Sequence, residues 1–184
     1  MRRFSTAKPG TKWPPDPDTG VARRFVRDLC IGAVAVICLH SFVVQISVVR
    51  GQSMAPSLRD GDRVVVDRVS YSLADISRFD VVILRYPKDP SLDFVKRIVG
   101  LPGDRVRMEA GFVTVNGERV DELFGHHPDK DEVVDTVVPF GKVFVLGDNR
   151  PISCDSRSFG MVDIQALRGK VRACFWPLDR MTFF

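Results

Sequence analysis

Residues 93–100 read DFVKRIVG, an apolar and partly β-branched run that is followed by the turn residues Leu101-Pro102-Gly103-Asp104. Such a run is typical of a β-strand in a protein core. Further stretches have the same character and are separated by Gly, Pro, Asn and Asp: residues 62–69, 79–86, 104–108, 112–115, 142–146 and 170–176. Because helical periodicity is weak in this part of the chain, we predict a mainly β fold with one antiparallel, coiled-sheet or barrel-like domain over residues 50–184.

A long apolar segment, residues 29–49, precedes the predicted β domain. It has 21 residues and no formal charge, and a helix of that length would extend about 31 Å, enough to cross a bilayer. Arg23, Arg24 and Arg27 lie on its N-terminal side, so the positive-inside rule predicts a single-pass transmembrane helix with a cytoplasmic N-terminus and an extracytoplasmic β domain. A cleavable signal peptide and a buried helix of a soluble protein are the alternatives.

The net charge of +4 is concentrated in residues 1–28, which hold seven Lys or Arg and three acidic residues. Residues 29–184 hold 20 basic and 20 acidic side chains. The first 28 residues are rich in Pro and Gly and have no apolar periodicity, so we expect a disordered, basic, cytoplasmic tail. The neutral balance of the remainder argues against nucleic acid as a partner.

Ser53 and Lys96 are the best candidates for chemistry. Ser53 lies four residues beyond the apolar segment, and Lys96 lies within the apolar run 93–100. A serine hydroxyl needs a base to accept its proton, and burial favours the neutral amine of a lysine. Taken alone, however, each segment also fits a plain reading: a turn serine, and a strand lysine whose amine reaches solvent.

Other side chains are poorer candidates for the base. His40 lies in the apolar segment, and His126 and His127 lie in a polar loop. Arg97 would stay protonated. We see no metal-ligand spacing and expect neither a metal nor a cofactor.

The cysteines form two groups. Cys30 and Cys38 lie in the apolar segment and are expected to be inert. Cys154 and Cys174 lie in the predicted extracytoplasmic domain, where a disulfide is chemically possible, and the sequence leaves their pairing open.

Four segments in a fixed order resemble the type I (leader) signal peptidases of bacteria, and the resemblance covers nearly all of residues 50–177. The segments are SMAPSL at 53–58, DRVVVD at 62–67, KRIVGLPGD at 96–104 and GDNRPISCDSRSFG at 147–160. The last two are the most specific. The family's fold, an all-β catalytic domain tethered by an N-terminal helix, agrees with the fold predicted from the strand pattern.

The resemblance implies roles for particular residues. Ser53 corresponds to the nucleophile, Lys96 to the general base, and Ser153 to the serine that orients the lysine amine. Supporting charges correspond to Asp155 and Arg157, with Asp148 and Arg150 in the same network. Shallow pockets for small substrate side chains correspond to Met54, Leu58, Phe94 and Val95.

One position departs from part of the family. Some members carry Ser or Thr two residues before the nucleophile, where its hydroxyl helps to bind the oxyanion, whereas this chain has Gly51. The backbone N–H of Ser53 remains as one oxyanion donor, and the sequence leaves the second donor open, with a backbone amide or a water as candidates.

The resulting hypothesis is a monomeric, membrane-anchored serine endopeptidase that uses a Ser-Lys dyad and an acyl-enzyme. It would remove signal peptides from exported preproteins after small-x-small sites, typically Ala-x-Ala. Two alternatives remain open: a Ser-Lys processing peptidase of the conjugation type, and a membrane-tethered, non-catalytic β module that binds exported proteins.

Overall fold

The structure, a computed structural model, describes residues 17–69, 76–109, 111–120 and 133–184. Two compact units divide the chain, one over residues 1–40 and one over residues 41–184, and each is described by itself. The predicted disorder of residues 1–16 and the predicted loop around His126 and His127 lie outside the described residues.

A single helix, α1 (Pro17–Val43), accounts for the described part of the first unit. Pro17 is its first residue, a position where the missing N–H needs no partner. The helix corrects two predicted boundaries, because it begins within the tail expected to be disordered and ends before residue 49. Many of its apolar side chains are exposed, among them Val21, Phe25 and Leu29. Within the described ranges, no helix is both long enough and apolar enough to cross a membrane.

The last residues of the predicted transmembrane segment form a strand, β1 (Val44–Val48). It pairs antiparallel with β2 (Arg63–Asp67), from Val44 opposite Asp67 to Val48 opposite Arg63. The prediction of helix here was wrong because β1 alternates β-branched and polar residues, which suits a strand with two different faces. β1 therefore belongs to the second unit.

The second unit is built on a curled antiparallel sheet with the strand order β1-β2-β11-β3-β4-β9-β10, and β12 pairs with β11. Its remaining strands are β3 (Val81–Arg85), β4 (Asp93–Gly100), β9 (Lys142–Leu146), β10 (Val162–Asp163), β11 (Leu167–Trp176) and β12 (Thr182–Phe183). The prediction of a mainly β, antiparallel domain is confirmed. Short helical turns connect the strands: η2 (Arg150–Ile152), α3 (Ser156–Phe159), η3 (Ile164–Ala166) and η4 (Leu178–Arg180).

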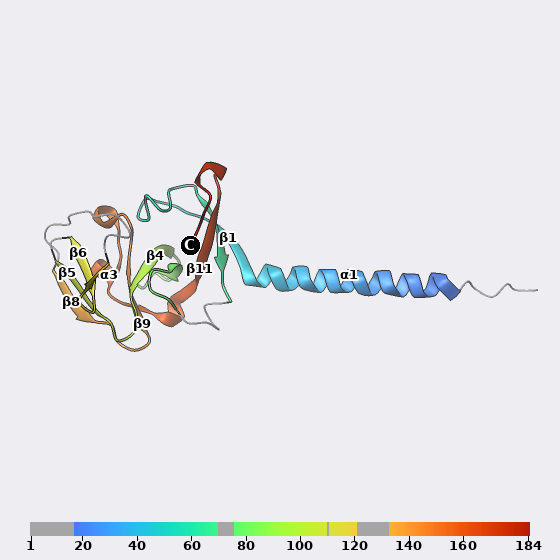
Figure 1. Cartoon of the computed structure of the whole chain (residues 1–184), viewed down its shortest axis with the longest axis horizontal. Helices are drawn as coiled ribbons and strands as arrows, with labels where there is room; N and C mark the ends of the chain where they lie inside the picture. The colour runs from blue at the N-terminus through green and yellow to red at the C-terminus, as the bar shows by residue number, and fades with distance from the viewer. Residues whose placement is uncertain (1–16, 70–75, 110, 121–132) are drawn as a thin grey trace, which may run out of the picture. The chain divides into compact units, whose positions relative to one another are not determined.

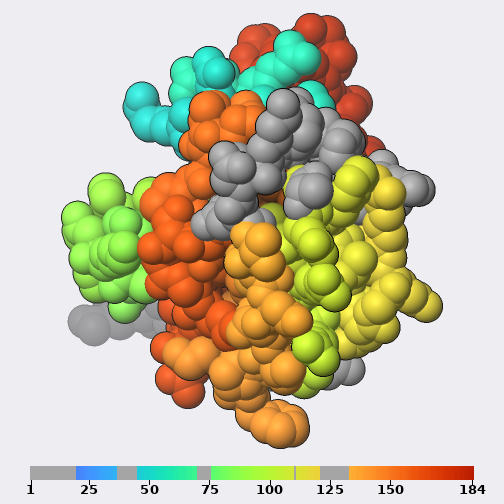
Figure 2. Space-filling model, turned by 90° about the vertical axis from the view of Figure 1, so that its left-hand side faces the viewer, coloured from blue at the N-terminus to red at the C-terminus, as the bar shows by residue number. Residues whose placement is uncertain are grey.

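A second, smaller sheet has the order β7-β6-β5-β8. Its strands are β5 (Arg105–Glu109), β6 (Phe112–Val115), β7 (Glu118–Arg119) and β8 (Val134–Val137). Figure 2 faces this side of the unit, where β5 lies between β6 and β8. Asn116 and Gly117 join β6 to β7 with φ angles of 54° and 87°. Two positive φ angles in succession make the hairpin turn that this dipeptide predicts.

Clusters of buried side chains hold the two sheets together. One contains Val99, Val106, Val113 and Phe144, and so joins the large sheet to the small one. Another contains Met54, Leu58, Val64, Val66, Val81 and Val171, and it anchors the turn that follows β1 on the strands of the large sheet. In Figure 1 these strands lie at the opposite end of the second unit from β5, β6 and β8. This packing fixes the position of Ser53, which directly precedes Met54.

Candidate active site

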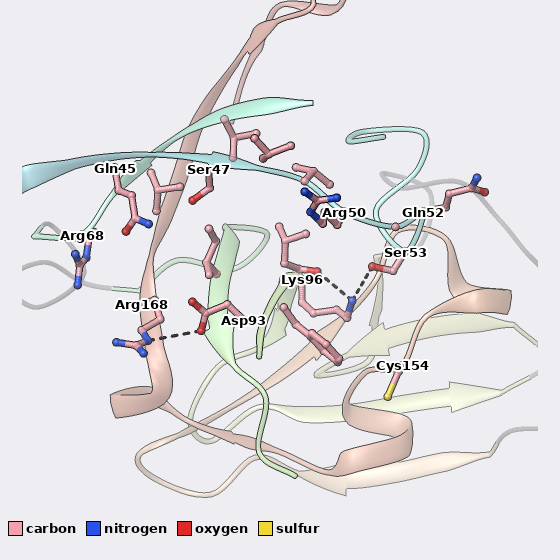
Figure 3. Close-up of a pocket in the computed structure, with 18 of the residues that line it drawn as sticks. Gln45, Ser47, Arg50, Gln52, Ser53, Arg68, Asp93, Lys96, Cys154 and Arg168 are labelled. Carbon is pink, nitrogen blue, oxygen red and sulfur yellow. Dashed lines mark hydrogen bonds and ion pairs between the residues drawn. The ribbon is translucent and has the colours of Figure 1, made fainter. Parts of the chain in front are cut away.

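Ser53 and Lys96, 43 residues apart in the sequence, meet in the second unit. Ser53 lies in the turn after β1, and Lys96 lies in the middle of β4. Nζ of Lys96 is 2.7 Å from Oγ of Ser53 and 3.0 Å from the carbonyl oxygen of Val95 (Figure 3). The amine can therefore accept the hydroxyl proton of Ser53 while it donates a hydrogen bond to a backbone carbonyl.

The environment of Lys96 favours the neutral amine. Its side chain is buried, with 3% of the residue exposed, and this desolvation lowers the pKa of Lys96 to about 8. The negative charges of Asp155 and Asp148 act in the opposite direction and raise this pKa. Burial is the largest effect, so a substantial fraction of the amine is neutral near pH 8.

Aromatic rings form part of the surroundings of the amine. Nζ of Lys96 lies 5.3 Å from the centroid of the Phe94 ring. The ring of Phe94 stacks on Tyr86 with 4.4 Å between centroids, and Phe159 packs against both. These contacts fix Phe94 next to Lys96 and help to exclude water.

The loop after β9 is bound to Ser53 and to Arg97, the residue that follows Lys96. Asn149 donates its backbone N–H to the carbonyl oxygen of Ser53 at 3.0 Å. Asp148 accepts two hydrogen bonds from Arg97, from Nε at 2.8 Å and from Nη2 at 2.6 Å. Arg97 follows Lys96 in β4, so this buried ion pair ties the loop to the strand that carries the lysine.

A second buried ion pair stabilises the same loop. Arg157 donates from Nε to Oδ1 of Asp155 at 2.8 Å and from Nη2 to Oδ2 at 3.0 Å. Asp155 also caps α3 by accepting the N–H of Arg157, and its Oδ2 accepts the N–H of Gly147. Arg150 joins the network through its carbonyl oxygen, which accepts a hydrogen bond from Arg157.

Ser153 lies close to the pair but does not hydrogen-bond to Lys96 in the structure. Its Oγ is buried and has no hydrogen-bond partner among the described residues. A Cβ added at Gly147 would overlap both the Ser153 side chain and the carbonyl oxygen of Ser53. Gly147 therefore allows these two serines to approach each other.

Ser53 and Lys96 open onto a groove of about 620 Å³. Phe94 and Val95 line it, as the family resemblance implied. Met54 and Leu58 were expected to line it as well, but the structure places both in the core, 1% and 0% exposed. The turn around Ser53 points these two side chains inward, because they anchor it on the sheet.

Sequence reasoning missed several groove and network residues. Gln45 and Ser47 line the groove from β1, which had been assigned to the membrane segment. Arg68 and Arg168 line its other end, and Arg97 is the partner of Asp148. The sequence does contain a signal for Arg68. Every second residue of an extended chain lies on the same face, so Arg68 is expected on the face that carries Val64 and Val66.

The two cysteines of the β domain are not paired. Cys154 is exposed and lines the groove, whereas Cys174 is buried in the core, and both thiols are free. The possible disulfide is therefore absent. Burial raises the pKa of the Cys174 thiol.

Comparisons with known proteins agree on one family. The family model described as "Signal peptidase, peptidase S26" matches residues 22–176. A signal peptidase I of Bacillus caldolyticus is 38% identical over 168 residues, which cover 83% of this chain and 91% of the relative. A signal peptidase IB of Staphylococcus aureus (strain MRSA252) is 32% identical over 177 residues, covering 86% and 92% of the two chains.

A solved structure is also similar. The crystal structure of a signal peptidase I from Enterococcus faecalis V583 covers 52% of this chain and 96% of its own, with 29% identity and a TM-score of 0.43. The matches to the family model and to the two relatives span most of the chain, and the relatives exceed 30% identity. The chain therefore belongs to the signal peptidases of peptidase family S26 and is a serine endopeptidase of the signal peptidase I type.

Proposed function

We propose that Ser53 is the nucleophile and Lys96 the general base of this peptidase. The observation that carries the proposal is the 2.7 Å separation of Nζ and Oγ, together with the lowered pKa of the buried amine. In its neutral form, Lys96 accepts the proton of the Ser53 hydroxyl as Oγ attacks the scissile carbonyl. The resulting ammonium gives this proton to the leaving amine, and water then hydrolyses the acyl-enzyme with the same amine as base.

Ser153 would act after the first proton transfer. An ammonium has three N–H donors, and the carbonyl of Val95 accepts one of them. The buried and unpartnered Oγ of Ser153 is a suitable acceptor for another. The hydroxyl would thereby orient the charged form of Lys96. The Asp155–Arg157 and Asp148–Arg97 pairs would act indirectly, by holding the loop that carries Ser153.

The oxyanion would be bound by the backbone N–H of Ser53. Among the described residues this N–H donates no hydrogen bond, so it is available. The N–H of Gly51 is not, because it already donates to Oδ1 of Asp60 at 2.7 Å. A preorganised donor next to the nucleophile stabilises the charge that develops on the substrate oxygen.

The substrate would be the end of a signal peptide, bound extended along the groove. Phe94 and Val95 line the groove beside Lys96. This half of β4 pairs with β3, and β9 pairs with β4 only from Arg97 onward, so residues 93–96 offer their other side to an added strand. The apolar groove lining, with Val64, Val66 and Ile83, suits small side chains at the first and third positions before the cut. The preference would be for small-x-small sites such as Ala-x-Ala. Both members of the dyad come from one chain, so a monomer would suffice.

The N-terminal part of the chain would hold the enzyme at the cell membrane. The apolar side chains of α1 that the structure describes, such as Val21, Phe25 and Leu29, are exposed, and Arg23, Arg24 and Arg27 lie in its N-terminal half. These features favour a membrane-associated helix with a cytoplasmic N-terminus and an extracytoplasmic peptidase unit. Alkaline carbonate extraction of membranes should leave the full chain in the pellet. Release into the supernatant would contradict an integral anchor.

The dyad is tested by cleavage of a preprotein with an Ala-x-Ala site. Ser53→Ala and Lys96→Arg should each abolish cleavage, because the first removes the nucleophile and the second installs a side chain that stays protonated. Matched controls are Ser91→Ala, in an exposed turn, and Lys142→Arg, at the start of β9. Both controls should cleave at the wild-type rate.

Thermal unfolding of each variant separates loss of chemistry from loss of fold. The Ser53→Ala and Lys96→Arg variants should unfold near the wild-type temperature, since neither Ser53 nor Lys96 forms an ion pair with any residue that the structure describes. Full cleavage by either folded variant would refute the dyad.

A further inference from the structure

The end of the groove away from Ser53 is lined by charged side chains. Arg68 and Arg168 line it together with Asp93 and Gln45, as Figure 3 shows. The part nearer the dyad is apolar, with Val64, Val66, Ile83 and Val95. The groove therefore changes from apolar to basic along its length.

The sheet brings the two arginines together. β2 and β11 pair antiparallel, with Asp67 opposite Lys170. One further step along each strand puts Arg68 beside Gly169, the neighbour of Arg168. Gly169 also approaches β2 closely, because a Cβ there would overlap the carbonyl oxygen of Asp67. Regular alternation would turn Arg168 to the face opposite Arg68, but the pairing of β11 with β3 is irregular between Leu167 and Gly169. Both arginines line the same end of the groove, Arg68 directly after β2 and Arg168 in β11.

The positive charge at this end is only partly neutralised. Nε of Arg168 is 3.7 Å from Oδ1 of Asp93, a loose ion pair whose side chains are 40% and 51% exposed. Arg68 is exposed and forms no hydrogen bond or ion pair with any residue that the structure describes. Among the described residues that line this end, two arginines face one carboxylate, so these side chains have a net positive charge and guanidinium donors that can bind an anion.

We propose that this basic end is a subsite for an acidic side chain of the substrate, four to six residues before the cut. The inference rests on the proposed function, which places the bond to be cut at Ser53 and the upstream residues along the apolar lining. Asp93 precedes Lys96 by three residues, or about 10 Å along an extended strand. A substrate strand that crosses this distance brings its fourth to sixth upstream side chains to Arg68 and Arg168. An aspartate or glutamate there is the side chain that a guanidinium pair selects.

The test uses peptides that share one Ala-x-Ala site and differ at the fifth upstream position, which is Glu, Gln or Lys. The full-length enzyme is assayed in a neutral detergent, and kcat/KM is measured for each peptide. The Glu peptide should be cleaved roughly three- to tenfold faster than the Lys peptide, a range suited to exposed ion pairs. The preference should weaken in 0.5 M salt, where charges at the surface are screened. Shifting the Glu to the fourth or sixth position locates the subsite.

Variants assign the effect to the arginines. Arg68→Ala and Arg168→Ala should each reduce the Glu-to-Lys ratio, and the double variant should bring it close to one. Asp93→Asn should increase the ratio, because it removes the competing carboxylate from Arg168. The matched control is Arg63→Ala: Arg63 is an exposed arginine of β2 that does not line the groove, and its removal should leave the ratio unchanged.

The outcomes separate this inference from the proposed function. If wild type cleaves all three peptides equally well, the subsite is refuted while the dyad stands. If wild type cleaves none of them, the proposed function itself fails. A third outcome would also overturn the subsite. In it, the arginine variants change cleavage only in vesicles with anionic phospholipid, and by the same factor for all three peptides. Arg68 and Arg168 would then contact lipid headgroups.

Discussion

Lys96 and Lys170 occupy neighbouring regions of the same sheet and have opposite surroundings. Both pair in register with Val82 of β3, Lys96 from β4 and Lys170 from β11. Nζ of Lys170 lies 2.5 Å from Oδ1 of Asp80, so it has a carboxylate partner. Among the described residues, Nζ of Lys96 hydrogen-bonds to a hydroxyl and a backbone carbonyl, both uncharged. Burial is the largest effect on the pKa of Lys96, and no carboxylate within hydrogen-bond distance among the described residues offsets it there.

The difference separates stability from chemistry. An ion pair such as Lys170–Asp80 is strongly disrupted when one partner is removed, because the other charge remains buried and uncompensated. Lys96, in contrast, lowers the stability of the folded protein while its amine is charged. Its pKa of about 8, against an ordinary 10.5, corresponds to roughly 3 kcal/mol of lost stability at pH 7, where the folded protein holds an ammonium in a desolvated position.

The largest effects are expected when each lysine is replaced by methionine, because the two substitutions should change activity and stability in opposite ways. Lys96→Met should reduce kcat/KM roughly ten-thousandfold by removing the base, and should raise the free energy of unfolding at pH 7 by up to about 3 kcal/mol. Lys170→Met should leave Asp80 buried without its cation, and should lower the free energy of unfolding by about 3 kcal/mol. Its activity at low temperature should stay near that of wild type.

Chemical denaturation and preprotein cleavage, measured on the same samples, check whether the two substitutions have these opposite effects. Adding Asp80→Asn to Lys170→Met should restore part of the lost stability, because it removes the buried negative charge that the ammonium of Lys170 had balanced. The comparison breaks if Lys170→Met abolishes cleavage while its fold persists, since Lys170 would then be part of the chemistry.

A smaller loss of activity is expected when Ser153 is changed, and it tests how the ammonium of Lys96 is oriented. Ser153→Ala should reduce kcat roughly a hundredfold by removing the proposed acceptor for the ammonium of Lys96. Stability should stay the same or rise slightly, because the lost hydroxyl is buried without a partner. Ser158→Ala, an exposed serine of the same loop, is the matched control and should change neither quantity.

A parallel loss of activity and stability in Ser153→Ala would indicate a structural role for this hydroxyl. An unchanged kcat would mean that the carbonyl of Val95 and the hydroxyl of Ser53 are sufficient to orient the amine.

The contrast between the two lysines also marks how far the sequence could predict the site. Both lie in strand-like apolar runs, and the strands were predicted correctly from composition and turns. The preference for Lys96 came from its apolar neighbours and from the family resemblance. Ser53 lies 43 residues away, and no local pattern reports such a tertiary contact. The carboxylate opposite Lys170 could not be predicted for the same reason.

Errors arose where tertiary packing decides between two local readings. Residues 44–48 continue an apolar segment, so they resembled the end of a membrane helix, but their backbone pairs with β2. Met54 and Leu58 were assigned to the groove because they flank the nucleophile, whereas the turn directs them into the core. Arg68 and Arg168 had no apparent role, because the strands that bring them together are about a hundred residues apart.

The smallest expected effect is the change of kcat/KM with pH, which tests the protonation of Lys96 in the wild-type enzyme. The active form is the neutral amine, so kcat/KM should rise with pH through about 8 and then level off. Between pH 7 and pH 9 the neutral fraction grows from about a tenth to about nine tenths, which predicts an increase of about ninefold. A profile measured with a peptide that does not itself titrate in this range gives the midpoint directly.

The free energy of unfolding should also change with pH as Lys96 titrates, and the direction of the change follows from the lowered pKa. The folded pKa of Lys96 lies below the unfolded value, so the unfolded chain binds more protons between pH 8 and pH 10.5. The contribution of Lys96 to stability therefore rises with pH across that window, and the stabilising effect of Lys96→Met should shrink as pH increases. Because wild type and this variant share every titratable group except Lys96, the difference between the two stability curves isolates Lys96. If that difference stays constant from pH 7 to pH 10, the amine keeps its ordinary pKa, and burial alone has not made it a base.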